Sequence, residues 1–157
     1  MHNHAVEDKD YRLWALLHQT RSALFKVRER DVSKYGITAT QSAVLFVIGT
    51  IGENATIGQI ARWLVREPHT MSNILMRMEK MGLINRVRNK NNRTEIIISL
   101  TKKGKEVHDK LMNDIVVIQE MMSCLSEEEY EFMYSCLKKL RDKALNYYVK
   151  IRDVPYP

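Results

Sequence analysis

The sequence predicts a mainly helical fold with one small β-hairpin. Over most of the 157 residues, apolar side chains recur at spacings of three, four and seven, which is the period of amphipathic helices. One stretch departs from this pattern: an asparagine-rich segment is followed by a β-branched run at residues 96–100. The chain has no low-complexity tract, repeat or linker, so we expect one continuous unit over residues 1–157.

Four helices are expected before the hairpin, at about residues 10–34, 39–51, 57–65 and 68–80. Thr56 and Gln59 have the spacing of a capping box, which marks the start of the third helix. Pro68 opens the fourth, because its fixed φ and missing donor suit a first helical turn. Glycines that end helices as left-handed caps follow three of the four: Gly36, Gly52 and Gly82.

Two further helices are expected after the hairpin. Thr101 caps the fifth, which runs to about Ser123, and Ser126 with Glu129 forms a capping box for the sixth, at about 127–149. These helices and the first carry more apolar surface than the short central helices can cover. We therefore expect residues 8–36 and 101–150 to be dimerisation helices that pack partly against a second copy of the chain.

The order helix, turn, helix, hairpin between Thr56 and Leu100 is that of a winged helix-turn-helix, and we assign the whole module to residues 37–100. In such a module the second helix lies in a major groove of DNA and the hairpin, or wing, reaches an adjacent groove. The fourth helix has an apolar stripe that should face inward: Met71, Ile74, Leu75, Met78 and Met81. The opposite face then presents short polar and cationic side chains.

Double-stranded DNA is the partner that these features favour. Asparagine can form two hydrogen bonds to adenine and arginine two to guanine, so Asn73 and Arg77 are the candidates for base contact. Seven lysines and arginines against one acid between Arg86 and Lys105, with a net charge of +6, favour phosphate contact. The predicted DNA-binding residues are His69, Thr70, Ser72, Asn73, Arg77, Arg86, Arg88, Lys90, Asn92 and Arg93.

Other classes of protein find little support. Phosphate-binding glycine loops, nucleophile elbows and zinc-protease motifs do not occur, so we expect neither an enzyme nor a cofactor. Apolar runs are too short for a membrane span, and the first ten residues do not resemble a signal peptide, which predicts a cytoplasmic protein. Cys124 and Cys136 lack metal-site spacing and we expect no metal site, while their redox activity stays open.

Three segments resemble the signature of MarR-type regulators: Met78–Ile84, the wing residues Asn91-Asn92-Arg93, and the stretch Ile98–Gly104. The resemblance implies a homodimeric transcriptional regulator whose recognition helices lie about 34 Å apart on a pseudo-palindromic operator. It also implies that Arg93 enters the minor groove. Ser72-Asn73 stands where the family carries Thr-Arg, which should change the operator sequence. Asn92 lacks the carboxylate that usually holds the wing tip.

The resemblance further implies control by a small aromatic or phenolic compound. Trp14, His18, Arg21 and Trp63 could line a crevice for an aromatic or anionic effector, although ordinary core or surface roles stay open for them. Two other interpretations stay open for the whole protein. They are a non-specific architectural DNA-binding protein and an interaction module that does not bind DNA.

Overall fold

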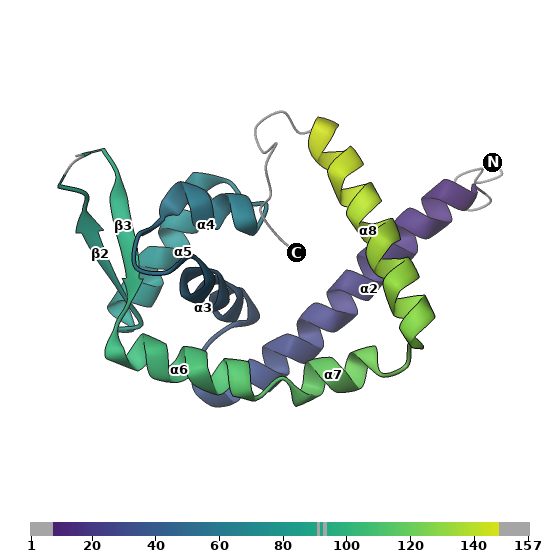
Figure 1. Ribbon diagram of the computed structural model, residues 1–157, viewed down its shortest axis with the longest axis horizontal. Helices are drawn as coiled ribbons and strands as arrows, with labels where there is room; N and C mark the ends of the chain where they lie inside the picture. Colours follow the sequence, from purple (N-terminus) through teal and green to yellow (C-terminus); the bar gives the residue numbers. More distant parts are fainter. Residues whose placement is uncertain (1–7, 91, 93, 148–157) are drawn as a thin grey trace, which may run out of the picture. The chain divides into compact units, whose positions relative to one another are not determined.

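The computed structural model describes residues 8–90, 92 and 94–147. It is mainly helical with a small antiparallel sheet, as predicted (Figure 1). Two compact units divide the chain, residues 1–39 and 40–157. The elements are α2 (Lys9–Val32), η1 (Ser33–Tyr35), α3 (Ala39–Ile51), β1 (Ala55–Thr56), α4 (Ile57–Trp63), α5 (Pro68–Lys80), β2 (Ile84–Arg88), β3 (Ile96–Leu100), α6 (Lys102–Asn113), α7 (Val116–Met122) and α8 (Glu127–Tyr147).

The first unit contains the long helix α2 and the short 3₁₀-helix η1. The carboxylate of Asp8 caps α2 by accepting hydrogen bonds from the amides of Asp10 at 2.8 Å and Tyr11 at 2.9 Å. The last turn of the predicted first helix is the tighter 3₁₀ form, which ends at Gly36 with a φ of 69°. The predicted helix and its glycine cap are therefore confirmed, with a change of geometry at its end.

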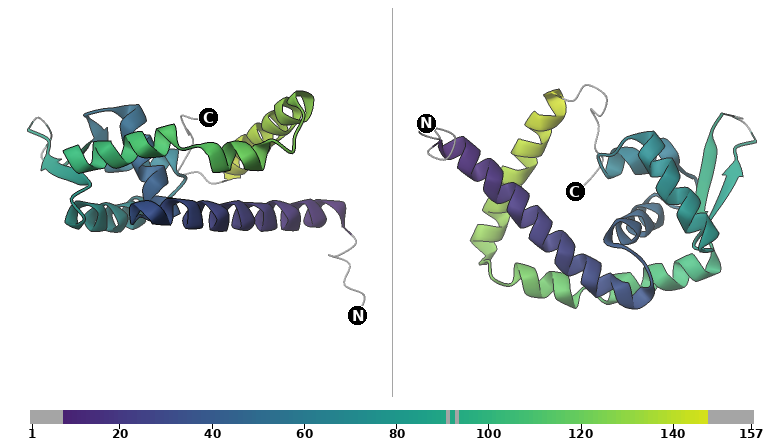
Figure 2. Two further views of the ribbon diagram at one scale, coloured as in Figure 1. Left: turned by 90° about the horizontal axis from the view of Figure 1, so that it is seen from below. Right: turned by 180° about the vertical axis from the view of Figure 1, so that it is seen from behind.

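The second unit holds α3, α4 and α5 around one apolar core next to the sheet. In the sheet β3 lies between β1 and β2, with Ala55 opposite Ile98 and Ile84 opposite Leu100. The hairpin of β2 and β3 projects beyond α4 and α5 in all the views of Figures 1 and 2. Core side chains with at most 2 % exposure come from every element of the module, among them Val44, Leu45, Ile48, Ile60, Met71, Leu75, Met78, Leu83, Ile84, Ile98 and Leu111.

Two features differ from the sequence-based expectation. Strand β1 was not expected, because two residues are too few to show an alternating pattern and the strand exists through its pairing with β3. The expected fifth helix is two helices, α6 and α7. It breaks at Asp114, whose φ of −112° and ψ of 68° are not helical. Asparagine and aspartate compete with helical hydrogen bonds through their own side chains, and Asn113-Asp114 stands directly before a β-branched stretch.

The turn between α4 and α5 contains a strained residue, Val65, with a φ of 49°. A β-branched side chain is disfavoured in this left-handed region by about 1 to 2 kcal/mol. The side chain is 47 % exposed, so little packing is lost when it is removed. We expect Val65→Gly to raise the free energy of unfolding by up to about 1 kcal/mol, as measured by urea denaturation.

Val87→Gly is the matched control for this substitution. Val87 is 59 % exposed like Val65, but it lies in the regular strand β2, where glycine weakens the strand by about 0.5 to 1 kcal/mol. If the free energy of unfolding rises in Val65→Gly and falls in Val87→Gly, the effect belongs to the backbone conformation at Val65. Equal destabilisation by both would contradict it.

Candidate nucleic-acid interface

Helix α5 separates its side chains into a buried face and an exposed one. Met71, Leu75 and Met78 have no exposed surface, which confirms the predicted inward stripe at these three positions. Because an α-helix turns once in 3.6 residues, positions 69, 73 and 77 share the opposite face, and His69, Asn73 and Arg77 are all exposed there. This face therefore carries one imidazole, one amide and one guanidinium, and these groups suit hydrogen bonds to base edges and phosphates.

The remaining predicted residues of α5 lie at the border of this face. Thr70 and Ser72 are half-buried, and the hydroxyl of Thr70 lies 3.3 Å from Nε2 of His69. Met76 is 41 % exposed between Asn73 and Arg77, a position that the sequence pattern did not single out. An apolar side chain at such a position can contact the methyl group of thymine.

The start of α5 is positioned by a short helix with a strong cap. Thr56 and Gln59 form the predicted capping box of α4: the Gln59 amide donates to Oγ1 of Thr56 at 3.2 Å, and the Thr56 amide donates to Oε1 of Gln59 at 2.9 Å. Pro68 then occupies the first turn of α5. These local signals set where the helix-turn-helix begins and where its second helix starts.

The end of α5 is tied to the start of α6. Gly82, with a φ of 70°, closes α5: its amide donates to the carbonyl of Glu79, and the amide of Leu83 donates to that of Met78. The next two carbonyls accept hydrogen bonds from Thr101, the N-cap of α6. Thr101 Oγ1 donates to Gly82 O at 2.6 Å, and the Thr101 amide donates to Leu83 O at 3.1 Å.

Lys103 extends this contact by one residue, since its Nζ donates to Met81 O at 2.8 Å. Three consecutive carbonyls, those of residues 81–83, are thus bound by residues 101 and 103. We name this set of contacts between residues 81–83 and 101–104 the α5–α6 junction. Gly104 belongs to it because a Cβ atom there would lie 1.9 Å from Leu83 O, so no other residue allows the same approach.

Hydrogen bonds connect four described residues of the wing: Asn89, Asn92, Thr94 and Glu95. Asn89 and Glu95 pair through the Asn89 amide to Glu95 O at 2.9 Å and through Asn89 Nδ2 to Glu95 Oε2 at 2.7 Å. Oδ1 of Asn92 accepts from the Thr94 hydroxyl at 2.7 Å. Asn92 therefore stabilises the turn by its own hydrogen bond, where the resembling family uses a carboxylate.

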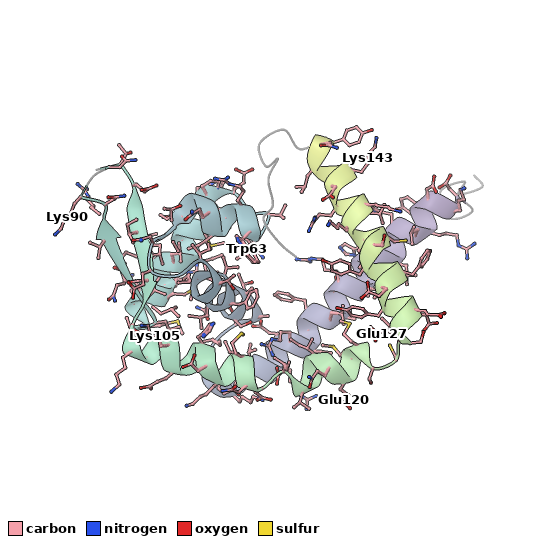
Figure 3. The ribbon with its side chains drawn as sticks, in the orientation of Figure 1. Trp63, Lys90, Lys105, Glu120, Glu127 and Lys143 are labelled. Carbon is pink, nitrogen blue, oxygen red and sulfur yellow. The ribbon has the colours of Figure 1, made fainter. Side chains whose placement is uncertain are left out.

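The predicted wing cations have different surroundings. Arg88 and Lys90 are exposed, and Lys90 lies towards the tip of the wing (Figure 3). Arg93 lies outside the described residues. Arg86 has a side chain only 14 % exposed and faces Glu79 of α5, with 3.6 Å between Nη1 and Oε2. This placement favours a structural role for Arg86, joining β2 to α5, over the predicted phosphate contact.

The predicted effector residues come from both units. Trp14, His18 and Arg21 lie on α2 in the first unit, where the Arg21 guanidinium is 5.9 Å from the ring centre of Phe25. Trp63 lies on α4 in the second unit and meets Phe46 edge to face, with 6.1 Å between ring centres (Figure 3). Their grouping into one crevice stays a prediction.

A separate cavity of about 550 Å³ lies within the second unit, between the end of α3, the end of β3 and the α6 residues Lys105, His108 and Asp109. The His108 ring packs directly against Gly49 of α3, and its Nδ1 is 3.1 Å from the Asp109 carboxylate. The cations and carboxylates of its lining are mixed, so charge alone does not select a ligand.

Within residues 8–90, 92 and 94–147, no three histidine, cysteine or acidic side chains group as a metal site would require. None of the helices in the same ranges combines the length and the apolar character needed to cross a membrane. Both cysteines are free thiols, with Cys124 exposed and Cys136 half-buried.

Comparison with known proteins agrees with this architecture. The MarR family model matches residues 37–96. The transcriptional activatory protein BadR of Rhodopseudomonas palustris is 29 % identical over 102 residues, a match that covers 64 % of this chain and 58 % of BadR. The HTH-type transcriptional regulator MhqR of Bacillus subtilis is 25 % identical over 150 residues, covering 92 % of this chain and all of MhqR.

Solved structures show the same fold. The ligand-free form of the organohalide-sensing regulator RdhR superimposes with a TM-score of 0.86 at 25 % identity, covering 96 % of this chain and 90 % of RdhR. Its 2,4-dichlorophenol-bound form superimposes with a TM-score of 0.81 at 26 % identity, covering 88 % of this chain and 82 % of RdhR. MepR of S. aureus in its DNA complex superimposes with a TM-score of 0.76 at 25 % identity, covering 83 % of this chain and 96 % of MepR.

The three-stranded sheet, the helix-turn-helix and the projecting hairpin define a winged helix-turn-helix protein of the DNA-binding class. Residues 37–96 match the model of the MarR family, and the curated relatives are transcriptional regulators. Members of this family are transcription regulators and not enzymes, which agrees with the function class expected from the sequence.

Proposed function

We propose that the protein is a sequence-specific repressor that binds a pseudo-palindromic operator as a homodimer. The observation that carries the proposal is the exposed face of α5, where His69, Asn73 and Arg77 stand opposite a fully buried apolar stripe. A helix anchored in this way presents its polar face as a rigid unit. In the major groove, Asn73 would read adenine and Arg77 guanine, and the wing would lie over the adjacent groove.

Charge in the second unit supports contact with the DNA backbone. Arg88 and Lys90 of the wing are exposed, and Lys102 and Lys105 are exposed at the start of α6. Figure 3 shows Lys90 on the wing and Lys105 on α6. Neutralising phosphates with such residues releases condensed counterions, which raises affinity for any DNA sequence. Sequence preference would then come from α5, and Arg93 would add the minor-groove contact that the family resemblance implies.

Exposed apolar side chains on the C-terminal helix support a homodimer. Phe132 is 74 % exposed, and Tyr134, Leu137 and Leu140 are between 40 % and 46 % exposed on the same helix, α8. Leu137 and Leu140, three residues apart, share one face of α8, and exposed apolar surface on a helix is typical of a protein interface. A two-fold dimer would place two α5 helices about 34 Å apart, one turn of DNA, so that the operator should be pseudo-palindromic.

The regulatory part of the proposal concerns repression and release. A dimer covering two half-sites would exclude RNA polymerase from an overlapping promoter, which is the reason for proposing repression. The RdhR structure holds 2,4-dichlorophenol. By similarity to it, we propose that a small aromatic or anionic compound releases this protein from DNA, with Trp14, His18, Arg21 and Trp63 as the candidate contacts.

The experiment is selection of duplexes from a random DNA library by the purified protein at near-physiological salt. We expect enrichment of a palindrome with half-sites about one helical turn apart. Retention without a motif would instead favour an architectural DNA-binding protein, and no retention would favour an interaction module. On the selected operator, failure of 2,4-dichlorophenol and related acidic aromatics to weaken binding would contradict the effector, and activation of transcription in vitro would contradict repression.

A further inference from the structure

The α5–α6 junction contains a lysine whose charge has a use other than phosphate contact. We propose that Lys103 is a positioning residue for DNA recognition: its ammonium group caps the C-terminal end of α5 and so holds Arg77 in register with the operator. The inference rests on the proposed docking of α5 in the major groove. It gives Lys103 a role different from the phosphate contact expected of the neighbouring cations between residues 86 and 105.

The geometry of the cap is specific. Lys103 Nζ donates to Met81 O at 2.8 Å, although 22 residues separate the two. Met81 is the residue that ends α5, and its carbonyl belongs to the partially negative end of the helix dipole. A cation at this position forms a charge-assisted hydrogen bond and interacts favourably with the dipole.

The backbone around Lys103 holds the side chain in reach of that carbonyl. Thr101 binds Gly82 O and Leu83 O, and its hydroxyl also accepts from the Gly104 amide at 3.0 Å as the N-cap of α6. The first turn of α6 is therefore fixed on both sides of Lys103. Because the backbone of Lys103 is already ordered, its hydrogen bond to Met81 O costs only the conformational entropy of the side chain.

The cap connects directly to the side chain proposed to read a base. The amide of Met81 donates to the carbonyl of Arg77 at 3.0 Å, so both residues belong to the last turn of α5. Bidentate contact between a guanidinium and guanine depends steeply on hydrogen-bond distance and angle. Loosening the end of α5 should consequently weaken operator binding more than binding to unrelated DNA.

Lys102 is a matched neighbour for the test. It carries the same charge in the same helical turn and is exposed, and its side chain has no hydrogen bond to any other part of the chain that the structure describes. A lysine that contacts phosphate changes the salt dependence of binding, with a slope of about 0.9 per contact in a log–log plot. A lysine that positions α5 does not.

The experiment compares Lys103→Gln, Lys103→Arg and Lys102→Gln with the unmodified protein, by fluorescence anisotropy on the selected operator and on a scrambled duplex between about 50 and 200 mM salt. For Lys103→Gln we expect the ratio of operator to scrambled affinity to fall about three- to tenfold with an unchanged salt slope. Lys103→Arg should restore the ratio, because a guanidinium can also donate to Met81 O. Lys102→Gln should weaken both duplexes alike and lower the slope.

Two results would overturn the proposal. One is a Lys103→Gln variant that loses about 0.9 of salt slope and equal affinity for both duplexes, since that is the behaviour of a phosphate contact. The other is a Lys103→Gln variant whose affinities for both duplexes equal those of the unmodified protein. Arg77→Ala separates this inference from the docking model: if it leaves operator preference intact, the docking of α5 is wrong, whereas an effect of Arg77→Ala without one of Lys103→Gln rejects the cap alone. Thermal unfolding of each variant shows whether it is folded.

Discussion

Gly104→Ala is expected to destabilise the protein by about 3 kcal/mol or more, although alanine is normally the better helix former by about 1 kcal/mol. A Cβ at this position would lie 1.9 Å from the carbonyl oxygen of Leu83. The obstacle is backbone, so it cannot rotate away as a side chain would. The first turn of α6 must move, and the hydrogen bond from the Thr101 amide to Leu83 O is lost with it.

Urea denaturation at a fixed protomer concentration measures this effect, since the stability of the proposed dimer would depend on concentration. Gly58→Ala is the control, because Gly58 lies in α4 and a Cβ there meets nothing within 4 Å. It should stabilise by about 0.5 to 1 kcal/mol. Gly49→Ala should fall between the two, since its Cβ meets the His108 ring, the end of a movable side chain. Equal results for Gly104→Ala and Gly58→Ala would disprove the close approach.

Replacing Asn73 or Arg77 by alanine is expected to relax base preference at one position of each half-site, by about 1 to 3 kcal/mol per variant. Both side chains are exposed on α5, so their removal should leave stability nearly unchanged. The measurement is competition binding against a set of operators in which every base pair is changed in turn. Binding profiles identical to that of the unmodified protein would reject the proposed docking of α5.

Lys90→Ala provides the contrast. Its side chain lies on the wing and is exposed, so we expect it to lower affinity for all duplexes to a similar extent and to reduce the salt slope by about 0.9. Arg93, which lies outside the described residues, is predicted to act broadly in the same way. A positional effect of Lys90→Ala at one base pair would contradict the separation between α5 as reader and the wing as backbone contact.

Much of the site could be predicted because its signals are local. The start of α5 follows from Pro68, and its buried and exposed faces follow from the helical period of Met71, Leu75 and Met78. Arg86 shows what such local reasoning does not reach. A basic residue in a basic segment resembles a phosphate contact. The side chain of Arg86 nevertheless lies against α5, because its side of β2 faces Glu79 of that helix.

The sequence by itself determined the helices, their caps, the wing and the polar face of α5, because periodicity, capping boxes and prolines act between residues a few positions apart. The tertiary structure decided what depends on distant partners. Strand β1, for example, exists through its pairing with β3. The α5–α6 junction joins residues 19 and 22 positions apart. In the sequence alone, the segment with Thr101, Lys103 and Gly104 indicates only a capped, basic helix start. Their second role, holding the end of α5, requires Met81, Gly82 and Leu83 to lie beside them in space.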